Sequence, residues 1–309
     1  MNVVALAGGT GGAKLAEGLQ QVLAPGELTV IANTGDDTER HGLLVMPDHD
    51  ALLYMLGGRF DFERGWGVTA ESWIVMDGLE GYGEDAWFRL GDRDFATHIA
   101  RSARLGRGDT LTAAVLGLQA AVGLRTRILP MSDHPVRTAV RTAAAWLEFQ
   151  EYFVHLRQGP DVLEVRVDGD RTPTPQVIAA LEEADLIVIG PSNPVVSIGP
   201  IVDGPIGELV RGRRATIPVV AVSPIIGGRA LKGPADRMLL SLGHESSALG
   251  VARIYADLAT VFVLDQEDAA LAAPVEALGL RPHVTDTLMM DALGRARLAA
   301  DVLGAAVPA

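Results

Sequence analysis

The chain starts with a short apolar strand that runs into a glycine-rich turn and then into a helix. The strand is Val3-Val4-Ala5-Leu6-Ala7, the turn spans residues 8–14, and the helical pattern covers residues 15–23. A buried strand that breaks into glycines and restarts as a helix aims free backbone N–H groups and the positive helix end at one spot. This order predicts a βα unit at the edge of a parallel sheet. A phosphate is the ligand that such a turn favours.

The residues of the turn suit a phosphate. Gly9, Gly11 and Gly12 let the backbone approach a ligand closely. Thr10 adds a hydroxyl group, and Lys14 adds a positive charge. The turn matches neither of two known phosphate-binding motifs. In the dinucleotide fingerprint the last position is glycine, and here it is Lys14. In the P-loop motif a Ser or Thr follows the lysine, and here a leucine follows Lys14. The alternative is a tight strand-to-helix turn that binds nothing.

Composition limits what else the chain can be. Its 309 residues are 48% hydrophobic and 21% charged, which is typical of a folded protein with one large α/β domain and an insertion, or with two domains. The formal net charge of −13 disfavours a nucleic-acid partner. We find no membrane-spanning run and no signal peptide, and expect a cytoplasmic protein. The absence of cysteine leaves carboxylates and imidazoles as metal ligands.

Strands and helices alternate in two parts of the chain. A second strand at residues 28–32 completes a βαβ unit, which predicts a parallel sheet with its ligand crevice at the carboxyl ends of the strands. Alternation resumes with strands at 185–189, 218–222 and 260–264. We predict a Rossmann-like, three-layer αβα fold with a mostly parallel sheet. Residues 1–58 and 171–309 form its nucleotide-binding core. Residues 59–170 form a mostly helical insertion that closes over the crevice and is interrupted by two short strands near residues 127–129 and 162–167.

Four aspartates follow the second strand within a short stretch. Carboxylates beside a phosphate site repel the phosphate unless a divalent cation lies between them, and oxygen ligands suit Mg²⁺. We predict that Asp37 and Asp50 bind Mg²⁺, and we interpret Asp36 and Asp48 as capping and turn residues.

A third loop follows the strand at 185–189 and contains Gly190-Pro191-Ser192-Asn193-Pro194. Prolines and short polar side chains directly after a buried strand make a rigid loop that suits clamping a nucleotide. Such a loop is on its own an ordinary turn. Because it ends on the same predicted sheet edge as the glycine turn, we interpret it as part of the site.

Several segments, in order along the chain, carry a resemblance to a known family. They are Ala7 to Lys14, Asn33 to His41, Pro47 to Asp50, Gly65-Trp66-Gly67, Leu90 to Asp94, Trp146 to Val154 and Gly190 to Ile198. Together they resemble the 2-phospho-L-lactate transferase family of coenzyme F-420 biosynthesis, over nearly the whole chain. The glycine turn and the Gly-Pro-Ser loop also resemble a related group of nucleotide-sugar-binding regulatory proteins.

The resemblance implies a Mg²⁺-dependent transfer. The donor is a guanosine diphosphate linked to lactate or to enolpyruvate, the acceptor is the ribityl hydroxyl of 7,8-didemethyl-8-hydroxy-5-deazariboflavin, and GMP leaves. The segment 59–170 then covers the acceptor site. Because Gly12-Ala13 stands where a small residue and proline occur in archaeal members, the acid on the donor stays open.

The resemblance also implies roles for the candidate residues. The glycine turn and Lys14 hold the diphosphate, and Asp37 and Asp50 bind the metal, with Asp50 preferred as the group that orients or deprotonates the attacking hydroxyl. Ser192 and Asn193 bind the nucleotide. Trp66, between two glycines, is the candidate to line the slot for the tricyclic ring.

The expected assembly is a homodimer. Two other functions stay open. A regulator that binds a uridine diphosphate sugar would need no acceptor. A dinucleotide-dependent oxidoreductase is disfavoured, because Asn33 rather than an acid ends the second strand.

Overall fold

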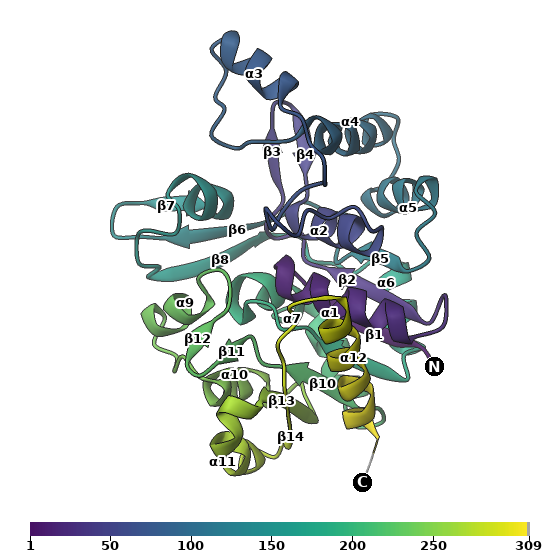
Figure 1. Cartoon of the computed structure of the whole chain (residues 1–309), viewed down its shortest axis with the longest axis vertical. Coiled ribbons are helices and arrows are strands. Elements are labelled where there is room, and N and C mark those ends of the chain that lie inside the picture. The colour runs from purple at the N-terminus through teal and green to yellow at the C-terminus, as the bar shows by residue number, and fades with distance from the viewer. Residues whose placement is uncertain (308–309) are drawn as a thin grey trace.

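A seven-stranded sheet forms the centre of the molecule in the computed structural model, which describes residues 1–307 (Figure 1). The strand order is β14-β13-β10-β9-β1-β2-β5, and every pair of neighbours is parallel. The strands are β1 (Val3–Ala7), β2 (Leu28–Ala32), β5 (Arg127–Pro130), β9 (Leu186–Ile189), β10 (Val219–Val222), β13 (Val261–Asp265) and β14 (Arg281–Thr285). The predicted parallel sheet is confirmed.

Helices cover both faces of this sheet. Alternate residues of each central strand point to opposite faces, so that Val4 and Leu6 join one hydrophobic core while Val3 and Ala5 join the other. One face packs against α1 (Gly9–Val22), α2 (Pro47–Leu56) and α12 (Ala292–Ala306). The other packs against α6 (Pro175–Glu182), α7 (Gly199–Val202), α8 (Pro205–Arg213) and α10 (Ala248–Tyr255). The three-layer αβα architecture is therefore as predicted.

The direction of the chain through the sheet reverses between β1 and β9. From β1 the chain passes outward to β2 and then β5, whereas β9, β10, β13 and β14 follow one another toward the opposite edge. In open α/β sheets, loops at the carboxyl ends of the strands separate at such a switch point and leave a crevice for ligands. The glycine turn follows β1 and the Gly190 loop follows β9, so both border this point.

The segment 59–170 differs from the predicted mostly helical insertion. It contains α3 (Ile74–Gly81), α4 (Asp92–Leu105) and α5 (Leu111–Ala121), but its strand β5 is an edge strand of the central sheet. It also forms a separate antiparallel sheet of β6 (Val136–Arg141), β7 (Trp146–Glu148) and β8 (Glu164–Gly169). The helical turn Glu151–His155 lies between β7 and β8 in the chain. Two of its strands, β5 and β8, lie where short strands are expected from the sequence, near residues 127–129 and 162–167, whereas β6 and β7 are not expected.

Short elements complete the structure. A hairpin of β3 (Thr38–Arg40) and β4 (Leu43–Val45) leads from β2 to α2, and a hairpin of β11 (Ile225–Ile226) and β12 (Arg229–Ala230) follows β10. The others are the helical turn Pro194–Ile198, α9 (Ala235–Ser241), the turn Gln266–Leu271 and α11 (Ala272–Glu276). None of the helices within residues 1–307 is long and apolar enough to cross a membrane.

Candidate active site

The glycine turn is packed tightly against the loop after β9. The Gly8 N–H donates to Ser192 Oγ over 3.3 Å. A Cβ on Gly11 would lie 2.2 Å from the carbonyl oxygen of Pro191, and a Cβ on Gly12 would lie 2.5 Å from Ser192 Oγ. Gly9 has a φ of 60°, in the left-handed region that favours glycine. The glycines thus let the turn after β1 pack closely against the loop after β9. They also leave space beside the N-terminal end of α1.

The N-terminus of α1 is free of a cap from its own segment. Gly8 is the N-cap residue and offers no side chain to the first turn. One N–H group, that of Gly9, donates to Asp48 Oδ1 over 2.6 Å. Thr10 and Gly11 follow in the same turn and are half-buried. The positive helix end therefore faces the switch point, as an anion site requires.

Asp48 and Asn33 join three loops at this point. Asn33 Nδ2 donates to Asp48 Oδ2 over 2.9 Å and to the Val196 carbonyl oxygen over 3.3 Å, while the Gly35 N–H donates to Asn33 Oδ1. Asp48 was interpreted as a capping residue, and it does accept a backbone N–H, but from α1 rather than from its own helix. Burial raises the pKa of Asp48 to about 6, against the hydrogen bonds from Asn33 and Gly9.

Asn33 connects three loops of the site through its side-chain hydrogen bonds, a role that was not predicted from the sequence. The signal was present, since a polar residue at the carboxyl end of a buried strand lies on the ligand edge of the sheet.

Asp36 and Asp37 are buried carboxylates with unused oxygens. Within residues 1–307, neither Asp36 Oδ1 nor Asp37 Oδ1 has a hydrogen-bond partner. Burial raises the pKa of both groups; the negative charge of Asp48 raises that of Asp36 further, while Arg137 and Arg101 oppose the rise at Asp37. A cavity of about 10 Å³ lies against them, at the lower limit of the space for one water. Buried carboxylates without partners are a physical sign of a missing cation or ligand.

Asp50 has a different environment from the predicted one. Its two oxygens accept from the two terminal nitrogens of Arg101, a fully buried residue of α4. Although burial alone would raise the pKa of Asp50, the charge of Arg101 and then the nearby His49 hold it below its usual range. The charge of Asp50 is thus balanced by Arg101 in this structure, and its predicted roles in metal binding and proton removal remain predictions.

The ion pair belongs to a buried network behind the site. His98 Nδ1 lies 3.5 Å from Asp50 Oδ2, and His98 Nε2 lies 3.1 Å from Asp94 Oδ1. The Tyr54 hydroxyl donates to Asp94 Oδ1 over 2.5 Å. These contacts connect α2 to α4 and leave Tyr54 only 1% exposed, so it cannot line a slot for an acceptor. The network positions the acidic loop rather than meeting a ligand.

The nucleotide loop contains structural contacts that the sequence did not indicate. Asn193 Oδ1 accepts from the N–H groups of Val195 and Val196 and caps the helical turn that follows, while Asn193 Nδ2 lies 3.3 Å from the sulfur of Met238. Ser192 is 3% exposed and holds the glycine turn. Their predicted contacts with a nucleotide remain predictions.

Trp66 and Lys14 lie at the outer side of the site. Trp66 is 43% exposed between Gly65 and Gly67, both of positive φ, and its ring meets that of Trp73 edge-on at 5.9 Å between centroids. Lys14 is half-buried on α1, and burial lowers its pKa. Phe149 and the nearby Tyr152, which are 6% and 1% exposed, pack in a hydrophobic core instead.

No group of three or more His, Cys, Asp or Glu side chains within residues 1–307 is arranged to hold a metal. Mg²⁺ does not require such a group, because it is commonly bound by one or two carboxylates together with water and substrate phosphates. The unpartnered oxygens of Asp36 and Asp37 match that pattern. The residues present, Asp36 and Asp37, therefore fit Mg²⁺.

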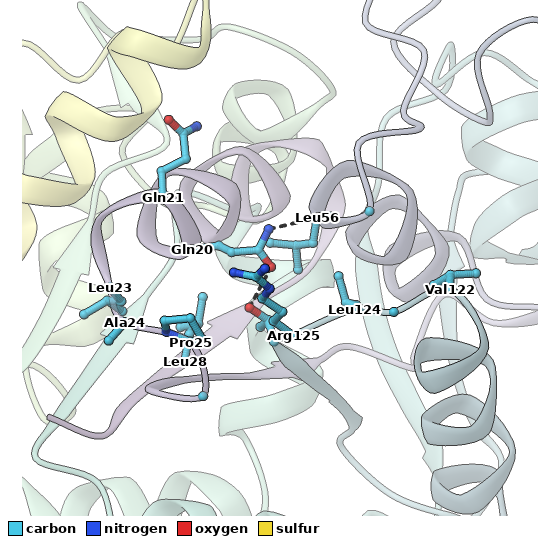
Figure 2. A pocket seen from close by; sticks show the side chains of 14 residues that line it. Gln20, Gln21, Leu23, Ala24, Pro25, Leu28, Leu56, Val122, Leu124 and Arg125 are labelled. Carbon is cyan, nitrogen blue, oxygen red and sulfur yellow. Dashed lines mark hydrogen bonds between the residues drawn. The ribbon is translucent and has the colours of Figure 1, made fainter.

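A cavity of about 460 Å³ lies elsewhere, at the amino ends of β2 and β5. Figure 2 shows Gln20 crossing it toward Leu56, whose carbonyl oxygen accepts a hydrogen bond from Gln20 Nε2 over 3.0 Å, with Arg125 beside it. It contains no carboxylate or histidine, and it lies at the sheet edge opposite the glycine turn. It is not part of the candidate site.

Known proteins match this chain over nearly its whole length. The profile of the family described as 2-phospho-L-lactate transferase CofD matches residues 3–303. The chain is 40% identical over 290 residues to the 2-phospho-L-lactate transferase of Methanosarcina mazei, covering 93% of this chain and 94% of that one. It is 43% identical over 312 residues to the phosphoenolpyruvate transferase of Streptomyces griseus, covering 98% of each.

A solved structure from Bacillus halodurans, described as a member of the UPF0052 family, has the same fold. Its TM-score is 0.66 at 16% identity, and the match covers 98% of this chain and 100% of that one. The profile and the relatives confirm the family predicted from the sequence motifs. The chain belongs to the 2-phospho-L-lactate transferase family, a family of transferase enzymes.

Proposed function

We propose that this protein is a Mg²⁺-dependent transferase of coenzyme F-420 biosynthesis. It moves a phospholactyl or phosphoenolpyruvyl group from a guanosine diphosphate-activated donor to the ribityl hydroxyl of 7,8-didemethyl-8-hydroxy-5-deazariboflavin, and it releases GMP. One observation carries the proposal: two buried carboxylates with unpartnered oxygens lie beside an uncapped helix N-terminus at the switch point of the sheet. An anion site next to unbalanced carboxylates calls for a phosphate together with a cation.

In this proposal the chain itself mainly positions charge. The N–H groups at the start of α1 bind the diphosphate, and Thr10 adds a hydroxyl donor. Asp36 and Asp37 hold Mg²⁺, which offsets negative charge on the diphosphate oxygens. Asp48 orients the Gly9 N–H and the Asn33 amide. Such electrostatic positioning is the main source of rate in phosphoryl transfer.

Asp37 is the proposed group that orients the attacking hydroxyl, because its Oδ1 has no hydrogen-bond partner within residues 1–307, whereas both oxygens of Asp50 accept from Arg101. Trp66, exposed at the rim, is the proposed contact for the tricyclic ring of the acceptor.

The first prediction concerns ligand-dependent stability. GDP with Mg²⁺ should raise the melting temperature by several degrees, because a ligand at a hundredfold excess over its Kd stabilises the native state by about 2.7 kcal/mol. GDP without Mg²⁺ should give a clearly smaller shift. Differential scanning fluorimetry with GDP, a uridine diphosphate sugar and NAD, each with and without Mg²⁺, makes the measurement.

Each other outcome has a meaning. Equal shifts with and without Mg²⁺ would remove the metal from the proposal. A larger shift with the uridine diphosphate sugar would favour the regulatory function. If GDP binds as expected, incubation of either donor with the deazaflavin should yield GMP and a phosphodiester product, and absence of both would reject the transferase.

The proposal keeps a homodimer in the cytoplasm as the working form. Nothing in the site requires a second subunit, so light scattering of the purified protein tests the assembly independently of the chemistry.

A further inference from the structure

The buried face of β6 contains one polar side chain, and it lies next to the acidic loop. Along this strand Val136, Thr138 and Val140 are buried, while the residues between them are half-exposed. Thr138 is 3% exposed, and within residues 1–307 its Oγ1 has no hydrogen-bond partner. Valine has nearly the same shape and would fill this position without burying a hydroxyl group. A buried hydroxyl at such a position is a sign of a ligand that it binds.

The hydroxyl of Thr138 is directed at the loop that follows β2. The Thr138 N–H donates to the Gly35 carbonyl oxygen over 2.7 Å, which fixes β6 beside this loop. A Cβ on Gly35 would lie 2.5 Å from Thr138 Oγ1, so a side chain at position 35 would displace the hydroxyl. The next residue, Asp36, accepts a hydrogen bond at its carbonyl oxygen from Gln150 Nε2 over 3.1 Å. Two parts of the segment 59–170 thus hold the acidic loop.

A small cavity joins this hydroxyl to the two unpartnered carboxylates. Its volume is about 10 Å³, and its lining includes Asp36, Asp37 and Thr138. The three side chains are 5%, 5% and 3% exposed, and each has an oxygen without a partner in the part of the chain that the structure describes. A space of this size accepts one water or one ion. Two carboxylate oxygens and a hydroxyl oxygen form a ligand set that suits a hard cation such as Mg²⁺.

The charges around the cavity favour a cation over water as its occupant. Besides the two aspartates, the charged residues that line it are Arg137 and Glu148. Glu148 Oε2 is already paired, since it accepts from Arg40 Nη2 over 3.1 Å. Arg137 Nη1 donates to the carbonyl oxygen of Val136 over 2.7 Å. One arginine therefore faces two buried carboxylates, and a further positive charge is needed to balance both when they are ionised.

Resting on the proposed function, we propose that the hydroxyl of Thr138 is a third protein ligand of the cation that Asp36 and Asp37 hold. The proposal gives the segment 59–170 a part in metal binding. The two aspartates follow β2 of the central sheet, whereas Thr138 belongs to the separate sheet of β6, β7 and β8. The bound cation would therefore connect the two sheets and stabilise their contact.

An isosteric substitution tests this role directly. The probe is Mn²⁺ alone, which prefers the same oxygen ligands as Mg²⁺ and whose free form is measured by electron paramagnetic resonance. Thr138→Val should weaken Mn²⁺ binding about 10-fold to 100-fold, the usual effect of removing a polar group at a metal site, and Thr138→Ser should keep most of the affinity. Thr112→Val is the matched control. Thr112 Oγ1 is also buried without a partner within residues 1–307, but it does not line this cavity, so its loss should leave Mn²⁺ binding unchanged.

Thermal stability gives a second readout. In EDTA, Thr138→Val should melt at or above the wild-type temperature, because it no longer buries an unpaired hydroxyl, and Mn²⁺ should raise its melting temperature less than that of wild type. A variant that melts lower by the same amount with and without Mn²⁺ would show that the cavity holds only a structural water.

That result would overturn the inference, as would a Thr138→Val variant that binds Mn²⁺ like wild type, or a wild-type protein that does not bind Mn²⁺. The proposed function has a separate test, since it fails if GDP with Mg²⁺ does not stabilise the wild-type protein.

Discussion

The four clustered aspartates have different properties because each meets different neighbours. Asp50 is held by Arg101, which lies in α4 and is distant in sequence. Asp36 and Asp37 are equally buried, yet each keeps an oxygen without a partner. Removing the charge of a paired carboxylate leaves a buried cation without its partner, which destabilises the fold. Removing an unpaired buried charge removes a desolvation cost, which stabilises the fold. Stability can therefore distinguish the two kinds of residue.

We predict opposite effects of two isosteric substitutions. Asp50→Asn should lower the free energy of unfolding by about 3–5 kcal/mol, because Arg101 stays buried without its carboxylate. Asp36→Asn should be at least as stable as wild type in EDTA, and should lose the extra stabilisation that Mg²⁺ gives with GDP. Denaturant unfolding and melting curves measure both. An Asp50→Asn variant of normal stability that no longer responds to Mg²⁺ would restore Asp50 as a metal ligand.

At the scale of elements, the site depends on how closely α1 and the loop after β9 approach. The distance is limited by Gly11 and Gly12, where the positions of an added Cβ would overlap Pro191 and Ser192. The interface of these two loops is also the wall of the proposed diphosphate site. A substitution that separates them should affect stability and nucleotide binding together.

We predict that Gly11→Ala costs about 1–3 kcal/mol of stability, since the methyl group would meet a backbone carbonyl oxygen 2.2 Å away. Its affinity for GDP should fall as well. Gly78→Ala in α3 is the control, because nothing lies within 4 Å of its Cβ and alanine favours a helix by up to about 1 kcal/mol. Chemical denaturation and GDP titration test this; a Gly11→Ala variant as stable as wild type would mean that the loops separate without cost.

At the scale of the whole molecule, the buried acids link protonation to metal binding. Asp48 has a folded-state pKa of about 6, above the unfolded value of 3.8, so the folded state binds this proton more tightly. Its contribution to stability is complete below pH 4 and is lost as the pH rises through 6, a change of about 3 kcal/mol. Burial shifts the pKa of Asp36 and Asp37 in the same direction. A bound cation would stabilise the ionised carboxylates and so offset this loss of stability at high pH.

The stabilisation by Mg²⁺ should therefore grow between pH 5 and pH 8. A guanosine diphosphate ester is the ligand to use, because a free terminal phosphate titrates near pH 6 and would obscure the effect. Melting temperatures with and without Mg²⁺ at each pH give the result, and Asp36→Asn should show a much weaker dependence. A stabilisation that does not change with pH would show that these carboxylates do not bind the cation.

Local patterns were sufficient to predict the first βα unit, the parallel sheet and the edge that bears the site. Residues 3–22 form strand, turn and helix because the apolar run, the glycines and the helical periodicity act over a few neighbours. Parallel order then brings the loops after β1, β2 and β9 to one edge. In the segment 59–170, β5 and β8 were expected, but β6 and β7 were missed, since runs of three to six residues are too short for periodicity to separate a strand from a loop.

The sequence by itself therefore determined the fold class, the family and the place of the site, because these follow from local order and from motif succession. Only the tertiary structure decided which carboxylates are free, since the charge of Asp50 depends on an arginine brought from α4. Electrostatic interactions act through space over a few ångströms, and that proximity arises when the chain folds.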